Sequence, residues 1–327
     1  MLCCSRFVQV TLYALALFLP TASVTAQNYP ARLVRLVVPF APGGAADIIA
    51  RAMSEPLNRA LGQNVIVDNR PGAGSSLAVD QVAKSAPDGY TVVIASQSGI
   101  IVNPIINTNV GYDVERDLAP IIQVTRSPLV IAVHPSLAAR TVAELVAEAK
   151  KSAGKLNFAT SGNGSMPHLA TMVFGGLTGA QMVHVPYKSG GLAVTSVVAG
   201  DTHLTFATSP SVMPQVQSGR LRGIAVTTKM RSPLVAGLPG MEESGIAGYD
   251  VSIWYGLFVP AATPRAVVMR LFDATTQALR DARFRELMAK DGTETPGSKS
   301  PEEFAAFIRE EARVTAKVIR ESGAKFD

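Results

Sequence analysis

LVRLVVPFAPGGAADIIARAMSEPLNRAL, residues 33–61, is the stretch that decides the fold. Its first six residues are apolar apart from one arginine, which is typical of a strand buried on both faces. A turn is expected at 39–44, and apolar residues then recur at helical spacing over 46–61, with Gly62 as the C-terminal cap. Pro56 lies inside this helix, so we expect a kink or a break there. Strand, glycine turn and helix together form the repeating unit of an α/β fold.

The same alternation of short strands and helices continues along the chain. Further strands are expected at residues 64–68, 90–95, 129–133, 157–160, 182–185, 203–207 and 221–226. Helices are expected at 75–84, from 141, from 166 to 177, from 191 to 198, and from 209, 264 and 301. Capping boxes precede two of these helices, at Thr141 and Glu144 and at Ser300 and Glu303. The pattern predicts parallel α/β layers, with a more helical C-terminal part.

The N-terminal segment is typical of a secretory signal. Arg6 supplies a positive charge, residues 7–19 are largely apolar, and small residues up to Ala26 predict cleavage after that position. A membrane anchor is the alternative, but the apolar run is shorter than the roughly 20 residues that span a bilayer. Cys3 and Cys4 stand before the run, whereas the cysteine of a lipoprotein would follow it. We therefore expect export to the periplasm.

Composition limits the class of protein. Hydrophobic residues make up 47% of the chain and charged residues 17%, which indicates a globular protein of a length suited to two domains. Both cysteines fall in the expected signal segment, so the mature chain has neither disulfides nor thiol chemistry. The formal net charge is +5 and aromatics are only 6%, without a basic groove interleaved with stacking residues. Nucleic acid is therefore not expected as a partner.

The loops that follow the strands are the expected ligand site. In α/β folds ligands bind where the carboxyl ends of strands and the N-termini of helices converge, which selects loops 39–46, 96–103, 161–168, 186–191 and 207–210. Free backbone N–H groups and the helix dipole at such a place bind a carboxylate or a phosphate without an arginine.

Two of these loops are rich in small residues that allow close approach to the backbone. The first supplies Phe40, Ala41, Gly43, Gly44 and Ala45. The second supplies Ser161, Gly162, Asn163, Gly164 and Ser165. The first loop by itself is better explained as a simple Pro-Gly-Gly turn. Two loops of this kind, one in each half of the chain, favour a two-sided clamp on a small anion.

Other chemistries lack their motifs. Gly72 and Gly74 begin a dinucleotide fingerprint, but Leu77 takes the place of the third glycine, and no Walker A lysine pattern occurs. The four histidines share no metal-ligand spacing, and no G-x-S-x-G elbow is present. Asp47 at the start of the first helix is most simply a capping carboxylate. His168 is either a structural histidine or a donor to a ligand carboxylate. We expect no cofactor, no metal and no enzymatic activity.

Nine segments resemble one known family over nearly the whole mature chain. The family is that of the periplasmic receptors of tripartite tricarboxylate transporters, the Bug or TctC-type proteins. The segments are VPFAPGGAAD (38–47), VDNRPGAG (67–74), APDGYTVV (86–93), YDVERDLAPI (112–121), HPSLAARTVAEL (134–145), FATSGNGSMPHLA (158–170), VHVPYKSGG (183–191), SGRLRGIAVT (218–227) and WYGLFVPAATP (254–264).

The resemblance implies a type II periplasmic-binding-protein fold. Two α/β domains would then be joined by a hinge that the chain crosses twice, with the ligand cleft between them. Residues 27–127 and 250–327 would form the first domain and 128–249 the second.

The resemblance also implies the residues that hold the ligand. Members of the family grip a carboxylate with the first loop and the glycine loop, and the loop after strand 90–95 lines the same cleft. The ligand-binding residues that this adds are Asp47, Gln97, Ser98, Asn103, His168, Tyr187, Ala207 and Thr208. Many relatives have an aspartate where this chain has Ala207, so an amino-acid ligand is less expected than an uncharged-tailed or aromatic mono- or dicarboxylate.

Transport is the function that the resemblance implies. The receptor, expected to be a monomer, would capture a small carboxylate, close around it, and deliver it to a membrane permease. The alternative is sensing, in which the closed form docks on a membrane signalling kinase. Both use the same cleft and differ only in the partner surface.

Overall fold

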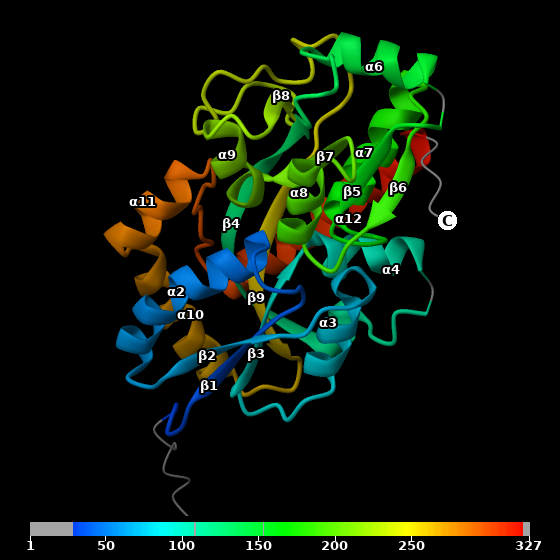
Figure 1. The fold of residues 1–327 in the computed structure, drawn as a ribbon. Coiled ribbons are helices and arrows are strands. Elements are labelled where there is room, and N and C mark those ends of the chain that lie inside the picture. The colour runs from blue at the N-terminus through cyan, green and yellow to red at the C-terminus, as the bar shows by residue number, and fades with distance from the viewer. Residues whose placement is uncertain (1–28, 108, 153, 323–327) are drawn as a thin grey trace, which may run out of the picture.

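The computed structural model describes residues 29–107, 109–152 and 154–322 (Figure 1). The expected signal segment and its cleavage site lie outside these residues. In the part of the chain that is described, no helix combines the length and the apolar character needed to cross a membrane.

Nine strands form one mixed sheet at the centre of the molecule. They are β1 (Val34–Val38), β2 (Val65–Asn69), β3 (Thr91–Ser96), β4 (Leu118–Val133), β5 (Asn157–Thr160), β6 (Val183–Pro186), β7 (Leu204–Thr208), β8 (Arg222–Val226) and β9 (Ser252–Pro260). Their spatial order is β2-β1-β3-β9-β4-β7-β5-β6, and β8 also pairs with β4.

Helices cover the sheet. They are α2 (Ala45–Leu61), α3 (Ser76–Ala83), α4 (Asn103–Ile106), α5 (Val114–Asp117), α6 (Val142–Lys151), α7 (Met166–Thr178), α8 (Gly190–Ala199), α9 (Ser209–Gln217), α10 (Arg265–Leu279), α11 (Ala282–Lys290) and α12 (Pro301–Ser322). A 3₁₀ turn, η1 (Ala73–Ser75), and a π-helical turn, η2 (Ser98–Val102), complete the set.

The prediction of parallel layers is right at the two ends of the sheet and wrong in its middle. β1 is parallel to β2 and β3, and β5 is parallel to β6 and β7. Between these groups, β9 is antiparallel to β3 and β4, and β4 is antiparallel to β7 and β8. The expected strand 129–133 is only the end of β4, whose earlier residues include Pro120 and Pro128. Prolines normally argue against a central strand, so the first part of β4 gave no strand signal.

β4 divides the sheet into two halves. Residues 118–128 pair with β9, in the half that also holds β1, β2 and β3, whereas residues 129–133 pair with β7 and β8 in the other half. The chain returns just before β9, where the Val251 N–H donates to the Thr227 carbonyl (2.9 Å). The chain thus passes twice between the first and the second half of the sheet. The domain boundaries expected near 127 and 250 lie close to these passages and stay a prediction.

Helix α2 forms where its apolar spacing predicts it. Ile49, Met53 and Leu57 lie on its buried face. Gly62 has φ +73°, and its N–H donates to the Asn58 carbonyl, which confirms the expected C-terminal cap. The helix continues through Pro56, so the expected break does not occur there.

Two other expectations need correction. Residues 98–103 of the loop expected at 96–103 belong instead to the helical turns η2 and α4, in which Ile100, Ile101 and Val102 are buried. The helix expected to have Pro264 as its first residue begins one residue later, with Pro264 as its N-cap. Both capping boxes are confirmed, since Thr141 caps α6 and the Glu303 N–H donates to the Ser300 hydroxyl (3.2 Å).

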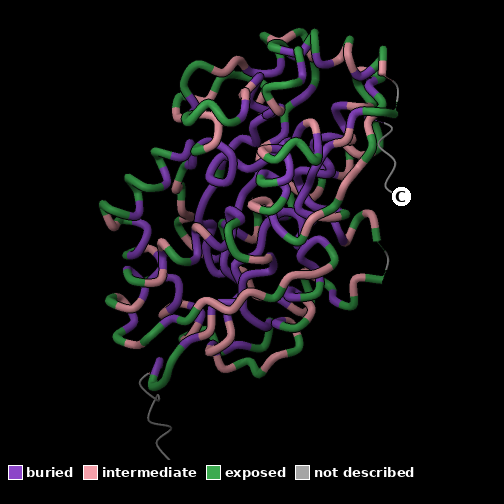
Figure 2. Tube along the Cα trace, in the orientation of Figure 1, coloured by how far each residue is buried: buried purple, intermediate pink, exposed green. Residues whose placement is uncertain are grey.

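Buried residues gather at the centre of the molecule, as Figure 2 shows. Helix α12 packs Phe304 against β9 in the core, whereas Val314 on the same helix is exposed. Trp254 and Phe304 meet edge to face with ring centroids 5.5 Å apart, and both side chains are fully buried. Gly256 lies under the Phe304 ring, where a methyl group would collide with it. The C-terminal helix is therefore part of the core of the first half.

Replacing Phe304 with alanine should lower the free energy of unfolding by about 3–5 kcal/mol, because the change leaves a cavity against Trp254 and Phe258. Urea unfolding checks this. Phe307→Ala on the same helix is the matched control and should cost clearly less, since Phe307 is only partly buried. Equal losses in the two variants would contradict this packing.

Candidate functional site

The N-termini of four helices converge on one small cavity between the two halves of the sheet. Helices α2, α7, α8 and α9 begin at or next to its wall. The lining residues are Phe40, Gly44, Ala45, Ala46, Ser98, Ser161, Pro167, Gly190, Thr208, Ile253 and Tyr255, none of which carries a charge. The cavity volume open to water-sized molecules is about 20 Å³, which is room for about one water.

Two of these helix starts leave their first N–H groups without a capping side chain. Gly44 is the N-cap of α2 and Thr208 that of α9, and neither accepts a capping hydrogen bond. In contrast, Ser165 caps α7 and Ser189 caps α8. Uncapped N–H groups and the positive ends of the helix dipoles favour an anion.

Asp47 holds the first loop in place from behind. Its carboxylate accepts hydrogen bonds from the Gly43 N–H (3.0 Å), Arg51 Nε (2.9 Å) and Asn69 Nδ2 (3.0 Å). Burial by itself raises the pKa of the Asp47 carboxyl, but these hydrogen bonds outweigh it and hold the pKa below its ordinary value. Asp47 is therefore ionised, and its carboxylate forms hydrogen bonds within the protein that hold the first loop. It does not line the cavity.

His168 holds the glycine loop in a similar way. Its Nδ1 accepts from the Gly164 N–H (3.2 Å), and its ring stacks on His184 with centroids 4.1 Å apart. Burial and the neighbouring His184 lower the pKa of His168 to about 3, and burial lowers that of His184 to about 4. Both rings are thus neutral at physiological pH. His168 lies behind the loop, outside the cavity lining, which favours the structural alternative over donation to a ligand.

The two halves of the sheet are in direct contact around the cavity. The Ala41 N–H donates to the Lys188 carbonyl (3.0 Å), and the Met166 N–H donates to the Ser98 hydroxyl (2.9 Å). Asn103 Nδ2 donates to the Gly74 carbonyl on its own side (2.9 Å) and to the Gly164 carbonyl across the gap (3.4 Å). These contacts close the cavity on several sides.

The structure brings together about a third of the predicted ligand-binding residues at the cavity itself. Those that line it are Phe40, Gly44, Ala45, Ser98, Ser161 and Thr208. A groove that adjoins it at Phe40 and Ser161 adds Gly162, Asn163 and Tyr187.

The remaining predicted residues lie around the cavity. Asn103, Ser165, Gly164 and Ala41 form the contacts and caps described above, and Gly43 lines a separate hollow beside α8. Ala207 is buried within β7.

Gln97 is the clearest departure from the expected cleft. Its side chain points away from the cavity and lines a different pocket, against α12. Ser98, the next residue, does line the cavity. Both residues follow β3 in helical backbone conformation, where successive side chains are turned by roughly 100° about the helix axis, so the two point in different directions.

Ile253 and Tyr255 line the cavity and were missed by the sequence reasoning. Both lie on β9, whose run SIWYGLFVP is rich in β-branched and aromatic residues and could have been recognised as a strand. Positions 253 and 255 share one face of that strand. Burial raises the pKa of the Tyr255 phenol, which therefore stays protonated and able to donate at neutral pH.

Metal ligands do not gather in this region. Over residues 29–322, leaving out 108 and 153, no group of three or more His, Cys, Asp or Glu side chains is placed to hold a metal ion.

The paired histidines should make stability depend on pH. Because their folded pKa values lie below that of an exposed histidine, the unfolded chain binds protons first, so stability present above pH 6.5 is lost as the pH falls. The slope should be at most about 1.4 kcal/mol per pH unit for His168 and less for the more exposed His184. Urea unfolding at pH 7, 6 and 5 measures it.

A double change, His168→Gln with His184→Gln, should flatten this dependence between pH 6.5 and 5. His134→Gln, at a half-buried position outside the stacked pair, is the control. An unchanged slope in the double variant would show that the imidazole pair is not the source.

Comparison with known proteins agrees with this geometry. Residues 49–324 match the model of the tripartite tricarboxylate transporter family receptor. The chain is 35% identical to protein BugT of Bordetella pertussis over 319 residues, covering 96% of this chain and 98% of BugT. The solved structure of the periplasmic binding protein BugD has a TM-score of 0.86 at 31% identity, covering 91% of this chain and 99% of BugD. A solved structure of an R. palustris protein with adipate has a TM-score of 0.86 at 32% identity, covering 90% of this chain and 98% of that protein.

The α/β periplasmic-binding-protein fold expected from the sequence motifs is thereby confirmed, as is the family. The chain belongs to the tripartite tricarboxylate transporter receptors of the Bug, or TctC, type, a family of periplasmic solute-binding proteins.

Proposed function

We propose that this chain captures a small organic carboxylate in the cavity between the halves of its sheet and delivers it to a membrane permease of the tripartite tricarboxylate type. One observation carries the proposal, namely the convergence of four helix N-termini, from both halves, on a cavity without charged side chains. The adipate bound to a relative at 32% identity supports a carboxylate, and the description of the matching family model supports the permease.

The carboxylate would lie at the uncapped starts of α2 and α9. Backbone N–H groups there are donors, and the hydroxyls of Ser161, Thr208 and Tyr255 on the cavity wall add more. Phe40 and Ser161 line both the cavity and the adjoining groove, so the rest of the ligand would extend into that groove. With alanine at position 207, no carboxylate is offered there to an ammonium group of a ligand.

Closure would accompany capture. We propose residues 27–127 and 250–327 as one domain and 128–249 as the other, with β4 and the segment before β9 as the hinge. A cavity of about 20 Å³ is too small to admit an organic acid, so the halves must separate for the ligand to enter. A ligand that touches both domains would then favour the closed population.

A small acid that fits should stabilise the folded protein. At about 100 times its dissociation constant it should add roughly 2.7 kcal/mol to the free energy of unfolding. A thermal-shift screen against mono-, di- and tricarboxylates, aromatic acids and amino acids measures this. Recovery of the acid chemically unchanged supports a receptor. Its conversion to a product, or the absence of any shift, would overturn the proposal.

Tyr255→Phe should weaken binding of the acid found in that screen by about tenfold or more, because a hydrogen bond to a charged group contributes about 1.5–3 kcal/mol. Calorimetric titration gives the dissociation constants. Tyr249→Phe is the matched control, since that hydroxyl donates to the Ala170 carbonyl (2.7 Å) and is not among the cavity-lining residues. Tyr249→Phe should lower stability and leave the affinity for the acid unchanged. If Tyr249→Phe weakens binding and Tyr255→Phe does not, Tyr255 is not part of the binding site.

Gly191→Ala should act as a wedge against closure. Its new methyl carbon would lie 2.5 Å from the Gly43 carbonyl oxygen across the cleft. We expect a larger radius of gyration in solution scattering with ligand present, and affinity reduced in proportion to the lost closed fraction. Leu192→Ala, at the exposed next position, is the control. Normal closure and affinity in Gly191→Ala would refute the hinge closure proposed here.

A further inference from the structure

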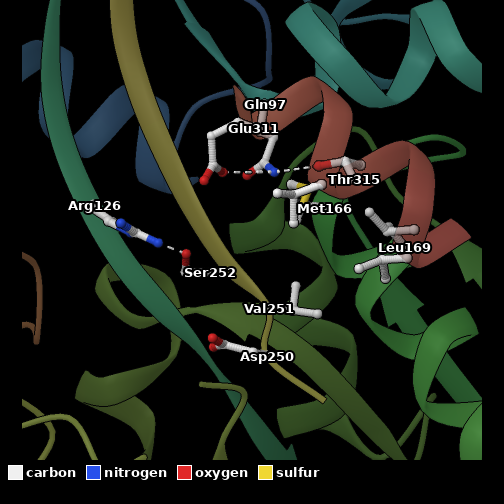
Figure 3. A pocket seen from close by; sticks show the side chains of 11 residues that line it. Gln97, Arg126, Met166, Leu169, Asp250, Val251, Ser252, Glu311 and Thr315 are labelled. Carbon is white, nitrogen blue, oxygen red and sulfur yellow. Dashed lines mark hydrogen bonds between the residues drawn. The ribbon is translucent and has the colours of Figure 1, made fainter. Parts of the chain in front are cut away.

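A second pocket lies at the junction of the two halves, on the side of helix α12 (Figure 3). It is lined by Gln97, Arg126, Met166, Leu169, Asp250, Val251, Ser252, Glu311, Val314, Thr315 and Val318. Its volume for water-sized molecules is about 120 Å³, well above that of the cleft cavity. None of its lining residues is shared with the cleft cavity.

Gln97 presents an unsatisfied acceptor in this pocket. Its side chain is only 5% exposed, and its amide nitrogen donates to Thr315 Oγ1 (3.1 Å) and Glu311 Oε2 (3.4 Å). Its buried carbonyl oxygen Oε1 has no partner within the described residues. A buried acceptor without a hydrogen bond costs about 1–3 kcal/mol, so an N–H donor would be bound favourably here once a small rotation of the amide uncovers the oxygen, of which less than 1 Å² is exposed.

Glu311 adds a carboxylate next to this acceptor. The neighbouring Glu310 pairs with Arg313 at 2.6 Å, whereas no lysine or arginine nitrogen reaches Glu311 within 4.0 Å in the described part of the chain. Burial raises the pKa of the Glu311 carboxyl, and Arg126 partly offsets this. Arg126 itself donates to the Ser252 hydroxyl (3.2 Å), as Figure 3 shows.

The balance of charge in the pocket favours a cation. Two carboxylates, Glu311 and Asp250, line it against one guanidinium, Arg126. Met166, Leu169, Val251, Val314 and Val318 supply apolar surface for a short carbon chain. An ammonium group has three N–H donors, enough for the Gln97 oxygen and the Glu311 carboxylate together.

We propose that this pocket binds a small molecule carrying a primary ammonium group, with the N–H donors on Gln97 Oε1 and the Glu311 carboxylate. The site goes beyond the proposed carboxylate capture, and it does not depend on it. Met166 and Leu169 belong to the second half of the sheet and Gln97 and Glu311 to the first, so the pocket exists as described only where the halves meet.

Trp254 offers a reporter for this pocket. It is the single tryptophan of the chain, and its indole N–H lies near Glu311 and lowers the pKa of that carboxyl. Ile253 and Tyr255, on the other face of β9, line the cleft cavity. Fluorescence of Trp254 therefore reports on the second pocket more directly than on the cleft.

The test is a titration of the purified protein with ethylammonium chloride at constant ionic strength, followed by Trp254 emission and melting temperature. Tetramethylammonium chloride is the matched control, because it carries the same charge and no N–H donor. A saturable change with ethylammonium alone supports the site. Equal or non-saturating responses to the two salts would overturn the proposal and would mean that Gln97 Oε1 accepts hydrogen bonds from water instead.

Variants separate this site from the cleft. Glu311→Gln and the near-isosteric Gln97→Met should each weaken ethylammonium binding at least tenfold, while Glu310→Gln should not. All three should keep the stabilisation by the carboxylate found in the acid screen. Full ethylammonium binding in both Glu311→Gln and Gln97→Met would refute the proposal. If no carboxylate stabilises the parent protein in the acid screen, that result refutes only the proposed function.

Discussion

The antiparallel pairing of β4 with β9 is the interaction on which the rest of the structure depends. It joins residues 118–128 to 252–260, far apart in the sequence, within the first half of the sheet. From there β4 continues as residues 129–133 into the second half, so this one strand ties the two halves together (Figure 1). The same pairing places Ile253 and Tyr255 in the cleft and turns Trp254 toward α12 on the opposite face. Both pockets therefore lie beside one strand, on its opposite faces.

In the proposed site, backbone N–H groups would do what arginine side chains do in many anion sites. Helix starts, glycines and small side chains line it, and the charged groups nearby are engaged elsewhere, as in the pairing of Asp47 with Arg51. Backbone donors are fixed by the helices, so they need no reordering when a ligand arrives. This arrangement favours anions as a class, and leaves the choice among acids to the shape of the groove beside it.

Backbone N–H groups bind an anion well only if the loops that carry them have a fixed conformation. Buried polar side chains fix these loops. Asp47 fixes the first loop through Gly43, and His168 fixes the glycine loop through Gly164. His168 stacks on His184, which in turn stacks on Phe158, and this packing limits its movement. Asp47 and His168, which the family resemblance implies as ligand contacts, thus support the backbone of the proposed site.

The sequence by itself determined most of the strands and helices in their order, though not β9 or the first part of β4. It also determined both capping boxes, the two glycine loops and the family, because each depends on local spacing or on contiguous motifs. It also pointed to Phe40, Gly44, Ser161 and Thr208 at the cavity, since strand ends converge in any α/β fold. Only the tertiary structure decided that β4 and β9 run antiparallel across the middle, that Gln97 turns away from the cleft, and that Tyr255 enters it. The physical reason is that strand pairing between distant segments, and the face that each residue then presents, depend on packing partners that no local pattern encodes.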